Sequence, residues 1–360
     1  MNQWKKGIKA VERFRFFVVL YCLSKYNGER SINAIYHLLQ GKKSSQTIQD
    51  AKLFKLESFF QSLQQLTKKD IEDIIFELQN SDVISMTNKD TYILTEKGLF
   101  YLENYMKKYP IPPYLNGWRY HKKALVFWQR LSLTVQTLSF LLYENSAFTP
   151  VINDDETQLF VKSYLTKIKN RYDASSVIFN EVKSLLQTIP QVQAEIFVLH
   201  LSGYHRIGYT IEQIGRFIHL DREYTFILFQ GVLHFMIDEI EKNAISYKHL
   251  TPFIQQNDQS REPITQSSQK TYELLCLNKS ISEIASIRNL KESTIEDHIV
   301  EISSEIKSFP IDPFVSKDLQ KKIVDSFYSL GTKRLKPIRS SLNNTVSYFQ
   351  IRLVLGRMEC

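Results

Sequence analysis

The chain contains little glycine, proline or cysteine, and each shortage excludes some classes of protein fold. Among 360 residues there are 11 Gly and 10 Pro, too few for the many turns of a β-sandwich or barrel, so the composition favours helices. The three cysteines, Cys22, Cys276 and Cys360, lie far apart in the sequence. That spacing excludes a disulfide framework or a cysteine metal site and is typical of cytosolic proteins.

Long apolar runs are also absent. The run "FFVVLYCL" at residues 16–23 has eight residues, which is too short to cross a bilayer. No small-residue cleavage site of the kind that follows a signal peptide comes after it. We interpret the run as a buried helix and predict a cytoplasmic protein.

The sequence lacks the common catalytic and cofactor motifs. It has no G-x-G-x-x-G or G-x-x-x-x-G-K-[ST] phosphate loop, so it is not predicted to be a helicase motor. It has no G-x-S-x-G elbow and no C-x-x-C pair. The eight histidines are scattered, and the acidic pair Asp154–Asp155 lies in a polar stretch typical of a solvated turn. The sequence therefore predicts no enzymatic activity, no cofactor and no metal.

The charged fraction of 23% is ordinary for a globular protein, and its balance is slightly positive. The 46 Lys and Arg outnumber the 38 Asp and Glu, for a net charge of +8, which suits a polyanionic partner without demonstrating one. The hydrophobic fraction of 43% is typical of a globular protein. The length predicts two or three domains.

Residues 68–105 show the pattern of a winged helix. An apolar helical face is followed by two short β-prone runs, "VIS" and "YIL", with the turn residues "MTNKDT" between them, and Thr95 then begins another helix. The phrase "YILTEKG" resembles the strand-to-helix junction of winged-helix proteins. The alternative is a helical domain with an incidental hairpin.

We predict a mostly α, multi-domain protein in which a winged-helix-like unit is followed by two helix-turn-helix units. A proline-rich stretch after residue 108 marks one boundary, and a polar stretch with few apolar groups marks another. The middle unit contains the capping box of Thr210 and Gln213. The predicted divisions are an N-terminal domain (1–108), a middle domain (109–250), a linker (251–266) and a C-terminal helix-turn-helix domain with a basic tail (267–360).

The stretch "SISEIASIRNLKESTIEDHIVEI" at residues 280–302 predicts a helix-turn-helix. Ser280 and Glu283 form a capping box, and Asn289 can adopt the left-handed conformation of a tight turn. Yet residues 280–306 contain six acids and only two bases. In a DNA-reading unit the last helix faces bases and phosphates, so we predict a protein-docking face here instead, formed by Glu292, Glu296, Asp297 and Glu301.

Basic residues gather in two other segments. The segment "GTKRLKPIRSS" at 331–341 is predicted to be a loop because it holds Gly331 and Pro337, and a basic loop suits phosphate contacts. The segment 107–130 has six Lys and Arg, no acids, and aromatic rings that could stack on single-stranded bases. The candidate nucleic-acid-binding residues are Lys321, Lys322, Lys333, Arg334, Lys336, Arg339, Trp118, Arg119, Tyr120, Lys122 and Lys123. The alternatives are a solvated basic surface and, for Trp118 and Tyr120, packing in the core.

Four stretches carry a family resemblance: "SINAIYHLLQGKKSSQTIQD", "YLNGWRYHKKALVFWQRLSL", "KESTIEDHIVEI" and "SYFQIRLVLGRME". The chain is similar to the YpbB family of bacterial helix-turn-helix proteins, and its C-terminal part resembles the helix-turn-helix domain at the end of some RecQ-type DNA helicases. The resemblance implies a non-catalytic accessory factor of a RecQ-like helicase in DNA repair or replication. Its implied partners are that helicase and, weakly, single-stranded or forked DNA.

Two other functions remain open from the residues. One is a transcriptional regulator that binds duplex DNA, for which a sequence-specific footprint is expected. The other is a helical scaffold for protein interactions that does not contact nucleic acid.

Overall fold

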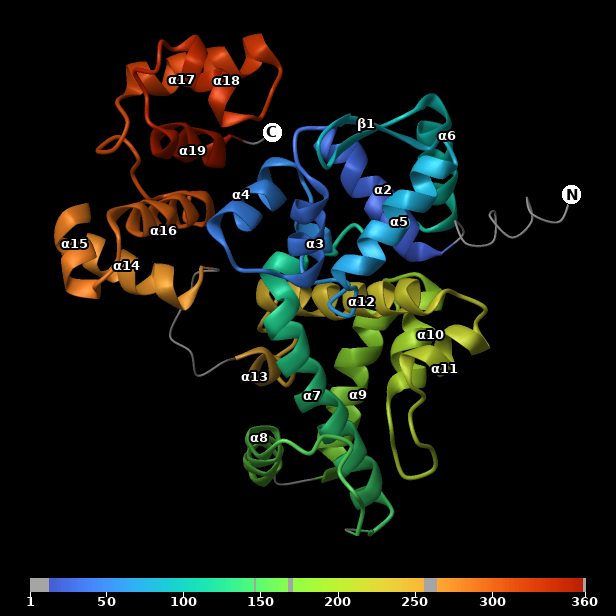
Figure 1. The fold of residues 1–360 in the computed structure, drawn as a ribbon. Coiled ribbons are helices and arrows are strands. Elements are labelled where there is room, and N and C mark those ends of the chain that lie inside the picture. Colours follow the sequence, from blue (N-terminus) through green and yellow to red (C-terminus); the bar gives the residue numbers. More distant parts are fainter. Residues whose placement is uncertain (1–12, 146, 168–170, 256–263, 359–360) are drawn as a thin grey trace, which may run out of the picture. The chain divides into compact units, whose positions relative to one another are not determined.

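The computed structural model describes residues 13–145, 147–167, 171–255 and 264–358, and these residues are mostly helical (Figure 1). The helices are α2 (Phe14–Tyr26), α3 (Ile32–Gln40), α4 (Ser45–Leu53), η1 (Glu57–Phe59), α5 (Lys68–Asn80), α6 (Glu96–Lys108), α7 (Gly117–Leu142), α8 (Asp155–Thr166), α9 (Arg171–Leu186), α10 (Gln191–His200), α11 (Ile211–Phe217), α12 (Arg222–Lys242), α13 (Thr251–Ile254), α14 (Gln266–Cys276), α15 (Ile281–Arg288), α16 (Glu292–Glu305), α17 (Lys317–Leu330), α18 (Leu335–Ser341) and α19 (Tyr348–Arg357). Two strands, β1 (Ile84–Asn88) and β2 (Thr91–Leu94), form one antiparallel hairpin. The predicted mostly α fold class is confirmed.

The chain packs as two units, each built from separate stretches of sequence. The first comprises Met1–Phe17 and Glu103–Asn257, and the second comprises Val18–Leu102 and Asp258–Cys360. The predicted N-terminal and C-terminal domains therefore contribute most of their residues to one unit. The four-part domain division stays a prediction, and residues 256–263 of its linker lie outside the described residues.

The first unit is organised around α7 and α12. The long helix α7 contacts α8, α9, α12 and α13, and α12 also packs against α10 and α11. The run of apolar residues in α12 is buried, as its sequence predicts. The capping box of Thr210 and Gln213 is present at the start of α11. These contacts arrange α10, α11 and α12 as the helix-turn-helix-like unit of the middle region.

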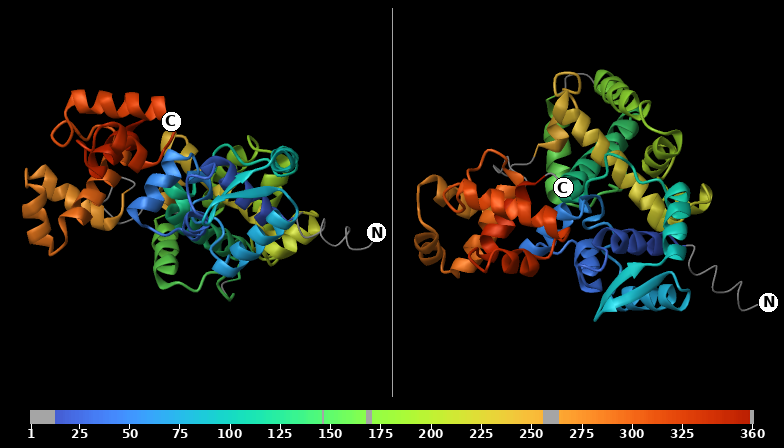
Figure 2. Two further views of the ribbon diagram at one scale, coloured as in Figure 1. Left: turned by 45° about the horizontal axis from the view of Figure 1, so that its top comes forward. Right: turned by 90° about the horizontal axis from the view of Figure 1, so that it is seen from above.

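The second unit contains the predicted helix, hairpin and helix. The apolar face of α5, which includes Ile71, Ile75 and Leu78, is buried. The hairpin packs beside α5, as the right-hand view of Figure 2 shows. Thr95 begins α6 as predicted, because its hydroxyl accepts a hydrogen bond from the backbone N–H of Gly98 at 3.1 Å. The winged-helix layout of 68–105 is thus present.

Glycine is required where α6 passes the start of the hairpin. A Cβ atom at Gly98 would lie 2.1 Å from the carbonyl oxygen of Val83, a backbone atom that cannot move aside cheaply. Gly356 in α19 differs, because a Cβ atom there would meet its nearest neighbour at 3.5 Å, an ordinary contact. The two glycines therefore form a matched pair for substitution.

We expect Gly98→Ala to lower the free energy of unfolding by about 1–3 kcal/mol, because the new methyl group must displace backbone. Gly356→Ala is the control, and it should leave stability unchanged or raise it by up to roughly 1 kcal/mol through helix propensity. Urea unfolding followed by circular dichroism measures both. Equal stability of the two variants would show that the α6–hairpin contact is looser than described.

The C-terminal stretch forms the predicted three-helix unit, α14 to α16, followed by three more helices. The capping box of Ser280 and Glu283 is present, and Asn289 ends α15 with a φ of 51°. The prediction of a loop over 331–341 was wrong for most of its length, because α18 forms there. Pro337 is the third residue of α18, where the backbone N–H that it lacks would have no partner within the helix.

Candidate interaction surfaces

Helix α16, the third helix of the C-terminal helix-turn-helix, is covered on several sides. It packs against α14 and α15 of its own unit, and also against α19 and α4. Ile295, Ile299 and Ile302 are fully buried in these contacts. A helix that reads DNA must present one long face to the major groove. Much of the surface of α16 is instead used within the fold.

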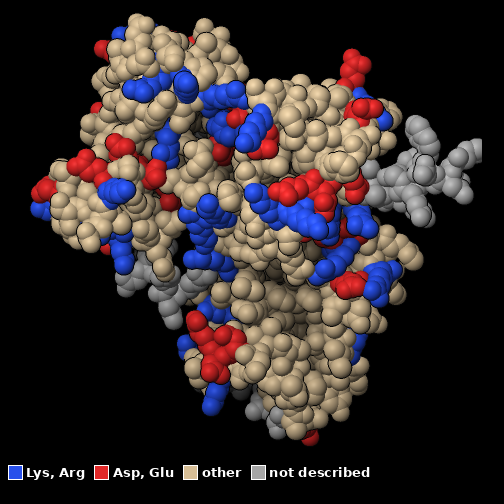
Figure 3. All heavy atoms as spheres, in the orientation of Figure 1, with Lys and Arg blue, Asp and Glu red and all other residues tan. Residues whose placement is uncertain are grey.

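The predicted docking acids on α16 have different environments. Glu292 is exposed, and Glu296 and Asp297 are half-buried. Burial raises the pKa of Glu296, and the neighbouring Asp297 raises it further. Asp297 forms an ion pair with Arg352 of α19. Figure 3 shows acidic side chains gathered over α15 and α16. This acidic face therefore offers a partner Glu292 and the exposed parts of Glu296 and Asp297, and their role in docking stays a prediction.

Glu301 lies inside the fold, with 4% of its surface exposed. Its carboxylate accepts hydrogen bonds from the backbone N–H of Thr265 at 2.5 Å, from the Thr265 hydroxyl at 3.2 Å and from the Ser268 hydroxyl at 2.7 Å. Burial raises the pKa of Glu301, and these hydrogen bonds oppose that rise. Glu301 of α16 thus holds the N-terminal end of α14 against α16. As a docking residue it stays a prediction.

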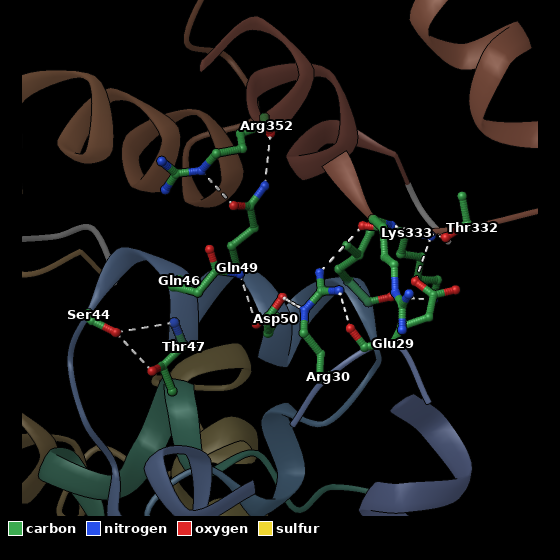
Figure 4. A network of polar contacts seen from close by, with 12 residues as sticks. Glu29, Arg30, Ser44, Gln46, Thr47, Gln49, Asp50, Thr332, Lys333 and Arg352 are labelled. Atoms are coloured by element: carbon green, nitrogen blue, oxygen red, sulfur yellow. Dashed lines mark hydrogen bonds and ion pairs between the residues drawn. The ribbon is translucent and has the colours of Figure 1, made fainter. Parts of the chain in front are cut away.

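A polar network that the sequence did not reveal joins the early and late stretches of the second unit (Figure 4). The Arg30 guanidinium donates to the Asp50 carboxylate at 2.8 Å, and Asp50 is only 3% exposed. Arg30 also donates to the Lys333 carbonyl at 3.4 Å. The backbone N–H of Lys333 donates in turn to the Glu29 carboxylate at 2.7 Å. These bonds fix the segment before α18 against the start of the unit.

Helix α4 is tied to α16 and α19 by further polar contacts. The Arg352 guanidinium donates to the Gln49 side chain at 2.8 Å, also drawn in Figure 4. Lys52 forms an ion pair with Glu305 at 2.5 Å. Gln49 and Lys52 both lie on α4. The contact between α4 and the last helices is thus polar as well as apolar.

Comparison with known proteins assigns the chain to a family. A family model described as a helix-turn-helix domain matches residues 267–355. Protein YpbB of Bacillus subtilis (strain 168) is 36% identical over 348 residues, which cover 94% of this chain and 96% of YpbB. The chain belongs to the YpbB family. No solved structure matches it.

In this YpbB-family chain the C-terminal basic residues divide into two groups. Lys333 donates to the Leu53 carbonyl at 2.5 Å, and its ammonium lies 4.7 Å from the centre of the Phe54 ring. Arg334 donates to the Gly28 carbonyl. Arg339 donates to the Val346 carbonyl at 3.1 Å. The second group, Lys321 and Lys322 of α17 and Lys336 of α18, is exposed, and so is Arg334 of the first group. Whether either group contacts nucleic acid stays a prediction.

The basic and aromatic residues at 118–123 lie on the first turns of α7. Trp118 is 8% exposed and Tyr120 is 4% exposed, and the Tyr120 hydroxyl donates to Asp238 at 2.8 Å. Arg119 and Lys123 both form ion pairs with Glu241 of α12. Lys122 is exposed. Buried rings are not available to stack on bases in this conformation, so nucleic-acid contact by this segment also stays a prediction.

No helix among the described residues has the length and apolar character needed to span a bilayer. The same residues contain no group of three or more His, Cys, Asp or Glu side chains arranged to hold a metal ion.

A buried histidine joins the three helices of the matched domain. His298 of α16 lies 2.9 Å from the Thr271 hydroxyl of α14 and 3.2 Å from the Arg288 guanidinium of α15, measured from its Nδ1 atom. Burial lowers the pKa of His298 to about 4, and the positive charge of Arg288 contributes. His298 is therefore neutral in the folded domain at pH 7, with Nδ1 as a hydrogen-bond acceptor.

This lowered pKa predicts an acid-sensitive domain. Between pH 6.5 and about 4 the unfolded state binds a proton at His298 more readily than the folded state does. The free energy of unfolding should therefore fall as the pH falls through this window. In His298→Asn, whose amide oxygen can accept the same bonds, the fall should be smaller by roughly 1–3 kcal/mol. Urea unfolding at pH 7 and pH 4.5 measures the difference.

The control is His219→Asn, which removes an exposed histidine whose φ of 57° Asn tolerates. An equal acid loss in the wild type and in His298→Asn would show that other groups cause it.

Proposed function

We propose that this YpbB-family protein is a non-catalytic accessory factor of a RecQ-like DNA helicase in DNA repair or replication. It would dock on the helicase through its helical units and contact DNA weakly through basic segments. One observation carries the proposal: the third helix of its helix-turn-helix domain is acidic and packed against α4 and α19. A helix in that state suits intramolecular and protein contacts better than a DNA groove.

Electrostatics supports a protein partner for the acidic face. Phosphate contacts supply much of the affinity of DNA-binding proteins, and carboxylates at the start of α16 would repel the phosphates. A basic surface on a partner protein would instead be attracted to Glu292 and Glu296. The resemblance of the C-terminal domain to the one at the end of RecQ-type helicases makes a helicase the partner to test.

Charge reversal at Glu292 and Glu296 tests the docking face. We expect Glu292→Lys/Glu296→Lys to weaken co-purification with the RecQ-like helicase about tenfold at low salt, because charge pairs across an interface are lost. The control, Glu273→Lys/Asp318→Lys, makes the same charge change at exposed acids of α14 and α17. Glu301→Lys is unsuitable, because it would remove the hydrogen bonds that hold Thr265 and Ser268. Unchanged association of the Glu292/Glu296 variant would contradict this docking face.

Salt dependence tests the DNA contact. We expect weak, sequence-independent binding to single-stranded and forked DNA that weakens steeply with salt. Replacing Lys321, Lys322 and Lys336 by Ala should reduce the slope of log K against log salt by roughly 0.7 per lost phosphate contact. Gel shifts at two salt concentrations measure this, with Lys162, Lys248 and Lys270 replaced by Ala as the control. A sequence-specific duplex footprint would favour the transcriptional regulator instead.

A further inference from the structure

An apolar groove lies within the first unit, between α7, α9, α10 and α11. Its volume is about 860 Å³. The lining is mostly aliphatic and aromatic, and includes Leu142, Phe179, Leu186, Val198 and Phe217. Over α9 and the C-terminal half of α7 the face shown in Figure 3 carries hardly any charged side chains. This groove takes no part in the surfaces described above.

Two of the lining helices are apolar on two sides. Helix α9 buries Ala174 and Leu185 away from the groove, while its Phe179 lines the groove and is 62% exposed. Helix α10 buries Phe197, while its Val198 lines the groove and is 44% exposed. A contiguous apolar surface on a second side of a helix is often an interaction site. Among the described residues, no helix covers the groove side of α9 and α10.

The dimensions of the groove match a helix. Its wall on α9 extends from Ser175 to Leu186 and its wall on α10 from Gln191 to the following Leu201, each about 15 Å long at the rise of an α-helix. Three helical turns span that length. A helix laid between these walls would complete a bundle with α7, α9 and α10, whose helices are normally about 8–10 Å apart.

The charges on the walls indicate what kind of molecule fits. Lys183 on α9 and Glu195 on α10 are the charged side chains of the lining, one of each sign. A groove with one cation and one anion cannot neutralise a series of phosphates, which argues against nucleic acid. An amphipathic helix with an acid facing Lys183 and a base facing Glu195 is complementary in both charge and polarity.

A second copy of the chain is a poor occupant. A concave groove cannot fill the same groove across a two-fold axis. A head-to-tail contact with a convex surface would leave one groove open at each step, so the assembly would either grow without limit or need to close as a ring. A helix from another protein, by contrast, can fill each groove with one partner molecule.

We propose that this groove binds an amphipathic helix of a partner protein, with Phe179 and Phe217 as its main apolar contacts. The inference rests on the proposed function in one respect, because the RecQ-like helicase is the partner used in the first arm of the test. The bound helix would present apolar residues spaced i, i+3, i+4 and i+7.

The first arm uses the full chain and the helicase. We expect Phe179→Glu/Phe217→Glu to weaken helicase association about tenfold or more, as for the loss of central apolar contacts in an interface. The control is Leu159→Glu/Ile245→Glu, at apolar residues that are 67% and 93% exposed and lie outside the groove. Circular dichroism and thermal unfolding check that both variants are folded. A photo-cross-linking residue at Phe179 should link to one amphipathic segment of the helicase.

The second arm does not need the helicase. A fluorescently labelled amphipathic peptide of about 14 residues, with leucines spaced i, i+3, i+4 and i+7, should bind the wild type and the control but not Phe179→Glu/Phe217→Glu. Peptide binding without helicase binding would support the groove and contradict the proposed function. Helicase binding that the groove variant retains unchanged would contradict the groove alone. Cross-links from Phe179 to a second copy of the chain or to DNA, or no discrimination by the peptide, would also overturn the groove proposal.

Discussion

The burial of α16 is the contact on which the second unit depends. This helix is at once the third helix of a helix-turn-helix and the surface on which α4 and α19 pack. Its isoleucines are buried, Asp297 and Glu305 form ion pairs with α19 and α4, and Glu301 holds the start of α14. The acidic character of α16 is thus partly explained by partners within the chain. The helix-turn-helix is common in DNA-binding proteins, and in this chain its third helix holds α4 and α19 together.

Buried charges give these contacts their specificity. Asp50 lies in the core beside Arg30, and burial raises the pKa of the Asp50 carboxyl although Arg30 acts against that rise. Such a pair adds little net stability, since desolvation offsets much of the attraction. Removal of one partner is costly, however, so the pair disfavours any packing in which the two groups are apart. The network around Arg30, Lys333 and Arg352 therefore disfavours arrangements of α4 in which these groups lose their partners.

Local features of the fold were predictable from the sequence, whereas long-range ones were not. The capping boxes at Ser280 and Thr210, and the turn at Asn289, follow from residues within four positions of each other. The contacts of Lys333 with Glu29 and of Arg352 with Gln49 join residues about 300 positions apart. The periodicity of a sequence cannot predict such distant pairs. For this reason the sequence did not show that Lys333 and Arg334, two candidate nucleic-acid-binding residues, have hydrogen-bond partners within the chain. Pro337 led to the wrong prediction of a loop at 331–341, because proline is common both in loops and in the first turn of a helix.

The divided second unit has a consequence for biosynthesis. Residues 18–102 leave the ribosome early, but Glu305 and Arg352, which pair with Lys52 and Gln49, are translated more than 250 residues later. At typical translation speeds this wait is on the order of 10–50 s. During this interval the nascent chain exposes the side of α4 that α16 and α19 later cover.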